Sequence, residues 1–394
     1  MILMNKNDII YLVGDGDITC KPLKVYSNLV CNFLDDLSRT IMNNILAKQY
    51  PDIVTFAFWC RKSNILKLKS EHLCNYIQVG RGSVFHIAPS NVPINFAFSL
   101  VFGLLAGNSN IVRVSTKDFK QVEIVCECIN KCLAKQEFQE LKRYICVVRY
   151  LHNKEITDEF SMNCNCRVIW GGDSTINKIR ESRISAKANE ITFADRYSFA
   201  IFDEKTIESF SEEEIRKIAE KFYNDTYLMD QNACSSPHLI MWKASEKKYG
   251  RKKFWDTLNV VAQKYDLQAK KAIDKYTLAA ELATKINYKL SIYSNYLYIA
   301  DLDELPNELD KLRGKFGFFF EIEIKSIKEI CKYINNKVQT CVVLGVDSKK
   351  IMDELIENNC SGIDRIVEVG QSMNIGVYWD GYDIVSSLSR IIIV

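Results

Sequence analysis

A repeated unit constrains this chain most: an apolar, strand-like run that leads through a turn into a helix-like run. Residues 84–88 (VFHIA) are predicted to form a strand, and apolar residues then recur between 94 and 105 at the spacing of a buried helix. Residues 111–114 and 144–150 are predicted strands, separated by an amphipathic helix over 121–133. Alternation of this kind is typical of a mostly parallel sheet covered by helices. We therefore predict an α/β fold.

A second unit of the same kind carries a glycine turn. The predicted strand 166–170 (CRVIW) runs into Gly171 and Gly172, and a helix is predicted over 173–180 with Ser174 in its first turn. Free N–H groups and the helix dipole at such a turn suit a phosphate. An ordinary strand–helix turn has the same pattern, so both interpretations stay open.

The charge balance and hydropathy exclude two classes of partner. The 394 residues include 52 Lys plus Arg and 49 Asp plus Glu, a formal charge of +3, which argues against non-specific nucleic-acid binding. The longest apolar stretch, 92–106, is interrupted by Asn95 and Ser99 and is too short to span a membrane. No secretory signal pattern opens the sequence. We expect a cytoplasmic protein with no membrane span and no nucleic-acid partner.

The 14 cysteines do not form a disulfide or zinc framework. Their density is well below the ~8–10% of disulfide scaffolds, and the sequence has no C-x-x-C element that a zinc site would use. Cys128, Cys132, Cys146 and Cys341 have apolar neighbours and are predicted to be small buried packing residues. We predict no metal site.

Cys234 has different surroundings. It lies in residues 230–237 (DQNACSSP), a polar segment of small residues that ends in proline and is typical of a tight turn. A turn can expose a thiolate among backbone N–H groups, which is where a nucleophilic cysteine works. An unreactive turn cysteine fits the same residues, so the local sequence leaves both interpretations open.

Several motifs resemble one known family, the LuxC-type fatty acyl-CoA reductases of the aldehyde dehydrogenase superfamily. The resemblance runs from about Gly80 to the end of the chain. Its main motifs are residues 86–93 (HIAPSNVP), 103–108 (GLLAGN) and 230–237, with supporting motifs at 339–340 (QT), 362–367 (GIDRIV) and 379–382 (WDGY). It implies an aldehyde dehydrogenase-like α/β fold with a Rossmann-like cofactor domain, an α/β catalytic domain and a small oligomerisation element.

On this resemblance we predict three segments. Residues 1–212 are expected to form the cofactor-binding domain, with an N-terminal extension, and residues 213–365 the catalytic domain. Residues 366–394 are expected to return to the cofactor domain or to an oligomer interface. The superfamily also implies a homo-oligomer.

The resemblance implies NADPH-dependent reduction of a fatty acyl thioester to the aldehyde, through an acyl-cysteine intermediate. The donor would be acyl-CoA or an acyl-protein, and an acyl-protein synthetase or acyl-transferase is an implied partner. Three alternatives remain: an aldehyde dehydrogenase acting oxidatively with NAD(P), a non-catalytic partner of an acylated protein, and a metal-binding redox sensor.

The resemblance also assigns roles to residues. Cys234 would be the nucleophile, and the Asn91 side chain would stabilise the oxyanion together with the Cys234 N–H. Asn91 could instead cap the helix that follows it. Glu190 falls where the superfamily has a general base, although an ordinary strand-end carboxylate is an equal interpretation. His86 is predicted to be a structural strand histidine.

The remaining assignments concern the cofactor. Arg113 stands where the superfamily has a ribose-contacting lysine, and Arg113 and Lys117 both suit the 2′-phosphate of NADP. Solvated strand-end charges are the alternative for both. The implied cofactor-binding residues are Arg113, Ser115, Lys117, Gly171, Gly172, Ser174 and Glu321, the last at the nicotinamide ribose.

Overall fold

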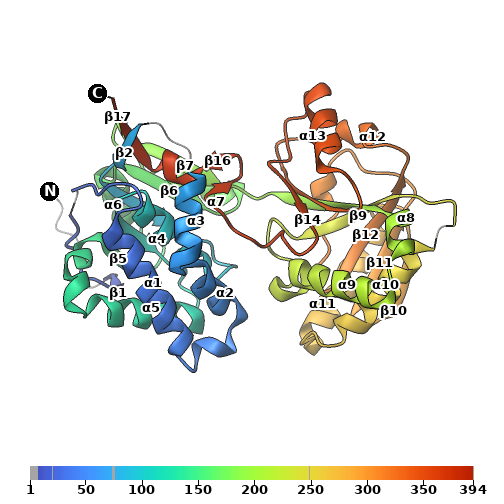
Figure 1. Cartoon of the computed structure of the whole chain (residues 1–394), viewed down its shortest axis with the longest axis horizontal. Coiled ribbons are helices and arrows are strands. Elements are labelled where there is room, and N and C mark those ends of the chain that lie inside the picture. The colour runs from blue at the N-terminus through green and yellow to red at the C-terminus, as the bar shows by residue number, and fades with distance from the viewer. Residues whose placement is uncertain (1–7, 20, 73–75, 248, 394) are drawn as a thin grey trace. The chain divides into compact units, whose positions relative to one another are not determined.

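Two sheets organise the chain, each in its own part of the sequence. The computed structural model describes residues 8–19, 21–72, 76–247 and 249–393. In this part of the chain a six-stranded and a seven-stranded sheet are the two large sheets (Figure 1). They belong to two compact units: the first combines Met1–Ala194 with Tyr382–Val394, and the second is Asp195–Gly381.

The sheet of the first unit is mainly parallel. Its order is β1-β5-β4-β3-β6-β7, with β1 antiparallel to β5 and every other neighbouring pair parallel. The chain moves outward from β3 through β4 to β5 and then continues on the other side of β3 with β6 and β7. Such a reversal opens a crevice at the carboxyl ends of the strands beside it. The strands are β1 (Ile10–Val13), β3 (Ser83–Ile87), β4 (Ser109–Arg113), β5 (Ile145–Arg149), β6 (Cys166–Trp170) and β7 (Asn189–Phe193).

Helix α4 (Asn95–Leu105) lies inside the first unit. Residues 96–105 are all buried, as expected for a helix that is apolar on every face. Gly103 is needed there, because a Cβ at this position would lie 1.8 Å from the Asn110 Oδ1 atom. The other helices are α1 (Asn28–Asn43), α2 (Pro51–Trp59), α3 (Lys62–Glu71), α5 (Lys120–Leu133), α6 (Lys154–Asn163), α7 (Asp173–Arg180) and α14 (Ile384–Ser387), with 3-10 turns η2 (Ala47–Gln49) and η3 (Gln136–Tyr144).

The C-terminal segment completes the first unit. After β16 (Tyr382–Asp383) and α14, strand β17 (Ser389–Ile392) pairs antiparallel with β2 (Ile77–Gly80). Asn108 Nδ2 donates to the Leu388 carbonyl oxygen at 2.9 Å. The two ends of the chain therefore contribute to the same unit.

The sheet of the second unit has the order β10-β11-β12-β9-β8-β13-β14 and is parallel except for the β10–β11 hairpin. Its strands are β8 (Tyr197–Asp203), β9 (Pro237–Lys243), β10 (Tyr288–Ser294), β11 (Leu297–Leu302), β12 (Phe318–Ile324), β13 (Val338–Leu344) and β14 (Arg365–Glu368), and β15 (Tyr378–Trp379) follows. The helices are α8 (Glu204–Ser209), α9 (Glu212–Thr226), α10 (Gly250–Ala262), α11 (Ala269–Ala283), α12 (Lys328–Cys331) and α13 (Ser348–Glu357), with 3-10 turns η4 (Tyr227–Met229) and η5 (Leu309–Lys311).

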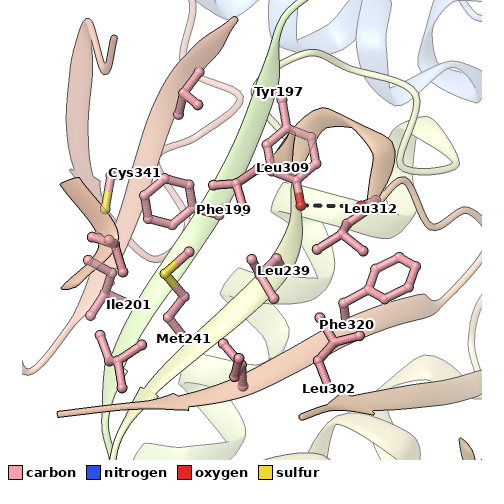
Figure 2. Close-up of a cluster of buried hydrophobic side chains, with 14 of the residues drawn as sticks. Tyr197, Phe199, Ile201, Leu239, Met241, Leu302, Leu309, Leu312, Phe320 and Cys341 are labelled. Carbon is pink, nitrogen blue, oxygen red and sulfur yellow. Dashed lines mark hydrogen bonds between the residues drawn. The ribbon is translucent and has the colours of Figure 1, made fainter. Parts of the chain in front are cut away.

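Apolar clusters cover both faces of this second sheet. Helices α9 and α10 bury aromatic residues such as Phe222 and Trp255 against one face. On the other face, α12 and α13 pack against a cluster that includes Phe199 and Met241 (Figure 2). Within this cluster the Tyr197 hydroxyl donates to the Leu312 carbonyl oxygen at 3.2 Å. Burial on both faces explains why β8 and β9 are continuous apolar runs.

The predicted elements are found with shifts of a few residues. The predicted strand 84–88 is β3 and the helix over 121–133 is α5. The units change between Ala194 and Asp195, earlier than the predicted 212/213, because β8 pairs with β9 and β13 and so belongs to the second sheet. Residues 366–381 stay with the second unit. No helix in the described residues is long and apolar enough to cross a membrane.

Candidate active site

The first unit gathers three predicted segments at one edge of its sheet. Asn91 follows β3, Lys117 follows β4, and Gly171 follows β6. Because these strands are parallel and adjacent, the turns after them lie at the same carboxyl edge, and the order of the strands reverses between β3 and β6. Ligands of doubly wound sheets bind at such a reversal.

Asn91 is exposed in the turn before α4. The helix begins at Asn95 and its N-cap position is Ile94, so the expectation that Asn91 caps this helix is wrong. The turn is tied to the next loop, because Lys117 Nζ donates to the Ser90 carbonyl oxygen at 3.2 Å. The Asn91 amide is therefore presented at the carboxyl edge of the sheet.

Arg113 is the last residue of β4, and Ser115 lies in the turn that follows the strand. The Arg113 guanidinium lies over the Tyr150 ring, 4.7 Å from its centroid, and its buried Nε has no hydrogen-bond partner among the described residues. Ser115 Oγ accepts from the Lys117 backbone N–H at 3.1 Å, which closes a local turn. Two cations thus lie at this strand end, as a bound phosphate would require.

The glycine turn after β6 is open. The Gly171 N–H donates to the Phe193 carbonyl oxygen at 3.1 Å. Gly172 is the N-cap residue of α7, and a Cβ built on it would meet nothing within 4 Å. Ser174 is exposed in the first turn of that helix. The space beside Gly172 fits the phosphate site that the sequence suggests, although its φ of −67° does not itself require glycine.

Glu190 is engaged in two ion pairs. Its Oε2 accepts from Arg167 Nε at 2.8 Å, and its Oε1 accepts from Arg180 Nε at 2.7 Å. Arg167 is buried, and it also donates to the Ser182 carbonyl oxygen at 2.6 Å. Both oxygens of the Glu190 carboxylate are thus occupied by guanidinium donors. These contacts favour a structural role for Glu190 over the role of a general base.

His86 is structural, as the sequence predicts. Trp170 Nε1 donates to Ser99 Oγ at 2.9 Å, and the Ser99 hydroxyl donates to His86 Nδ1 at 2.8 Å. His86 Nε2 then donates to Asn110 Oδ1 at 3.0 Å. Burial lowers the pKa of His86 to about 4, so the ring is neutral.

The Cys234 turn in the second unit is held in an unusual backbone conformation. Asp230 and Gln231 both have left-handed φ angles, 56° and 59°, which cost free energy for residues other than glycine. Two contacts fix Asp230: its Oδ1 accepts from Lys271 Nζ at 2.9 Å and also from the Tyr265 hydroxyl. Strain of this kind persists only where surrounding contacts hold it.

Gln231 anchors the same turn to the sheet. Its side chain is buried, Oε1 accepts from the Gly317 N–H at 2.7 Å, and Nε2 donates to the Phe318 carbonyl oxygen at 3.2 Å. The side-chain amide therefore binds the start of β12 as a neighbouring strand would. The sequence analysis predicts no role for Gln231. Its position within the cysteine motif at 230–237 was the signal that could have indicated one.

Ser198 fixes the backbone of the cysteine itself. Its Oγ donates to the Cys234 carbonyl oxygen at 2.6 Å and accepts from the Thr340 N–H at 3.2 Å. Ser198 is fully buried at the start of β8. The sequence offered no signal for Ser198, because a serine in a strand has many ordinary roles.

Cys234 is a half-buried residue, and the pKa of its thiol is raised. Burial is the main cause; the Arg196 backbone N–H and the Arg313 charge lower the pKa, and the charges of Asp195 and Asp380 raise it. Most of the other described cysteines are buried, among them the four predicted to be packing residues, while Cys20 and Cys74 lie outside the described residues.

Glu321 is not beside Cys234. It lies opposite Ile240 within β9, whereas the cysteine turn joins the amino end of that strand. The Glu321 carboxylate accepts from Trp242 Nε1 and Trp255 Nε1, each at 2.7 Å. Burial raises the pKa of Glu321, and the two indole N–H groups oppose this shift. The contacts favour a structural role for Glu321 over a ribose-binding role.

The chain is similar to one family of enzymes. Residues 68–392 match the family described as acyl-CoA reductase (LuxC). A long-chain acyl-protein thioester reductase of Photorhabdus laumondii is 23% identical over 320 residues, which cover 79% of this chain and 63% of that protein. The enzyme of the same name from Photobacterium phosphoreum is 23% identical over 331 residues, which cover 81% of this chain and 63% of that protein. The chain thus spans less than two thirds of these relatives.

Solved structures show the fold. A 1-pyrroline-5-carboxylate dehydrogenase of Thermus thermophilus superposes with a TM-score of 0.61 at 13% identity, covering 92% of this chain and 80% of that one. An NAD-dependent benzaldehyde dehydrogenase of Corynebacterium glutamicum gives 0.59 at 10% identity, covering 93% and 85%. The predicted aldehyde dehydrogenase-like α/β fold is confirmed.

Proposed function

The chain belongs to the acyl-CoA reductase (LuxC) family, and from this premise we propose that it reduces a fatty acyl thioester to the aldehyde through an acyl-cysteine on Cys234. The main support is the Cys234 turn. Two left-handed residues precede the cysteine, and Gln231 and Ser198 bind the turn to the sheet. A turn held so firmly is typical of a side chain that must be presented in one orientation.

Cys234 would form and release the acyl group. Its sulfur attacks the thioester carbonyl carbon, the thiol proton is lost, and the donor thiolate leaves and takes up a proton. The acyl-cysteine is then reduced to a thiohemiacetal by a hydride added to its carbonyl carbon and a proton added to its oxygen. This collapses when its C–S bond breaks, its hydroxyl proton is lost, and the Cys234 thiol is restored beside the free aldehyde.

A donor to the substrate oxygen is needed at each tetrahedral stage, and loss of one such donor typically costs ~10²–10³ in rate. We propose Asn91, together with the Cys234 N–H, for this role. The family resemblance supplies the assignment, and it is supported by the exposure of Asn91 in a turn where it does not cap α4.

NADPH would supply the hydride. The residues that would hold it are Arg113 and Lys117 after β4, for the 2′-phosphate, and the Gly171–Ser174 turn, for the pyrophosphate. The buried unpartnered Nε of Arg113 and the open space beside Gly172 support this assignment. Glu321 is not retained as a cofactor residue.

The acyl donor is proposed to be a protein-bound acyl thioester or acyl-CoA. The relatives' name, long-chain acyl-protein thioester reductase, favours the protein-bound form and with it an acyl-transferring partner protein. An aldehyde dehydrogenase acting oxidatively would need a general base to activate water, and the two ion pairs of Glu190 make that alternative weaker.

The test is covalent labelling of the full chain with a radiolabelled long-chain acyl-CoA, and in parallel with the same acyl group on an acyl carrier protein. We expect the wild type to take up the label and to release it as aldehyde when NADPH is added. A third arm replaces NADPH with NADH and so tests which of the two cofactors supports release of the aldehyde. Cys234→Ala should abolish labelling and lower turnover at least roughly a thousandfold.

Cys360→Ala is the matched control, because Cys360 is also a half-buried thiol of the second unit. It should label and turn over as the wild type does. Persistent acylation of Cys234→Ala, or a wild type that neither labels nor oxidises NADPH with either donor, would contradict the proposal.

A further inference from the structure

The segment 369–374, which follows β14, has no part in the proposed chemistry, yet it contacts the Cys234 turn. The hydroxyl of Ser235, the residue after Cys234, donates to the Met373 Sδ atom at 3.6 Å. The Ser236 hydroxyl lies 3.9 Å from the same sulfur atom. Both serines are buried. The two residues that follow the proposed nucleophile are therefore packed against this segment.

Asp225, in the last turn of α9, binds both partners of this contact. Its Oδ2 accepts from the Gly370 N–H at 2.6 Å, and its Oδ1 accepts from the Ser372 N–H at 3.1 Å. Its backbone carbonyl oxygen accepts from the Ser236 hydroxyl at 2.8 Å. Asp225 is 1% exposed, and hydrogen bonds in such surroundings are electrostatically stronger than in water. One buried residue thus connects the 369–374 segment to the cysteine turn.

Arg365, in the motif at 362–367, binds the same segment through its carbonyl groups. It donates to the carbonyl oxygens of Ser372 at 3.0 Å and Asn374 at 3.1 Å. Its guanidinium lies over the Trp379 ring, 4.3 Å from the centroid. The 369–374 segment has no helix or strand of its own. A carboxylate and a guanidinium therefore satisfy backbone groups that regular secondary structure would otherwise pair, and they fix the course of the segment.

We propose that Asp225 is a positioning residue, which sets the orientation of Cys234 through the residues that follow it and through the 369–374 segment. The inference rests on the proposed role of Cys234. Ser198 binds the carbonyl oxygen of the cysteine, and Asp225 and the segment bind the residues after it. A side chain fixed by contacts on both sides is presented in one orientation, as acyl transfer requires.

The test compares two reactions of Cys234 in the full chain: alkylation by iodoacetamide at a fixed pH, followed on the Cys234 peptide by mass spectrometry, and acyl labelling as described above. In Asp225→Ala we expect alkylation to be roughly three- to tenfold faster than in the wild type, because a looser turn exposes the half-buried cysteine more often. Acyl labelling should be about ten- to a hundredfold slower, because transfer needs the sulfur in one geometry.

Cys341 distinguishes this result from unfolding of the unit. It is fully buried in β13 of the same sheet, so its peptide should stay as protected as in the wild type while the Cys234 peptide reacts faster. Met373→Ala is a second variant, which removes the contact with the two serines and leaves the Asp225 side chain in place. It should change both reactions in the same directions as Asp225→Ala.

Asp353→Ala and Met352→Ala are the matched controls, because both side chains are exposed on α13, and both variants should react as the wild type does. The inference is overturned if alkylation of Cys234 is unchanged in both Asp225→Ala and Met373→Ala, or if Cys341 reacts in parallel with Cys234 in both. Alkylation needs no acyl transfer. This outcome is therefore distinct from failure of the proposed reduction, in which the wild type itself takes up no acyl label.

Discussion

At the scale of single residues, the partners of a carboxylate decide what it can do. Glu190 and Glu321 both lie on strands, and each is bound by two strong donors: guanidiniums in the first case, indoles in the second. Asp380 is bound by one neutral amide. Glu190 and Glu321 share their residue type and their position on a strand, so the difference between these two carboxylates lies in their contacts.

We expect Glu190→Ala to destabilise the protein and to leave acylation of Cys234 unchanged. The substitution leaves the buried Arg167 guanidinium without its carboxylate, which typically costs about 3–5 kcal/mol. Chemical unfolding measures the loss, and Glu159→Ala, at an exposed position on α6, should stay within about 0.5 kcal/mol of wild type. Unchanged stability with lost turnover would restore the general-base interpretation.

At the scale of elements, buried polar groups join the strands and helices of the first unit. His86 on β3 contacts Ser99 on α4 and Asn110 on β4, and Ser99 also accepts from Trp170 on β6. A satisfied network of this kind fixes how elements pack. Protonation of the ring would add a proton at Nδ1, which now accepts from the Ser99 hydroxyl.

The first unit should therefore lose stability in acid. The pKa of His86 is about 4 when folded against an ordinary value of 6.5, so between these values the unfolded chain binds more protons. Stability falls as the pH drops through this window, by up to about 3 kcal/mol. Hydrogen exchange of β3 and α4 amides from pH 7 to pH 4 should show this, less steeply in His86→Gln. The exposed His152→Gln should follow the wild type, and an equally steep loss in His86→Gln would contradict the assignment.

At the scale of the whole molecule, the chain leaves the first unit after Ala194 and returns to it at Tyr382. The returning segment buries Ile384, Val385 and Leu388 and adds β17 to β2. The stability of the first unit therefore depends on residues at both ends of the sequence.

We expect Leu388→Ala to destabilise the protein by about 2–4 kcal/mol, because its side chain is 1% exposed and truncation leaves a cavity. Ile391, three residues later, has a side chain that is 49% exposed. Ile391→Ala should therefore lower the free energy of unfolding by less than about 1 kcal/mol. Urea unfolding of both variants measures the difference. Equal losses would show that the C-terminal segment is not packed as described.

Local sequence predicted the α/β class, most elements near their observed bounds, and a turn at Cys234. These follow from periodicity and turn chemistry, which are set by neighbouring residues. The family resemblance placed the domain boundary at 212/213, after β8 and not before it. Local patterns do not reveal which sheet a buried strand joins, and β8 joins the second one.

The sequence by itself determined which residue types stand near the nucleophile, and the family motifs identified Cys234. Only the tertiary structure decided their roles. Gln231 binds Gly317, 86 positions away, and Glu190 is neutralised by arginines on β6 and α7. Such partners are fixed by strand order and register, because a side chain's neighbours across a sheet are distant in the chain. The reactivity of a carboxylate or thiol depends on those neighbours and on burial, and both exist only in the folded state.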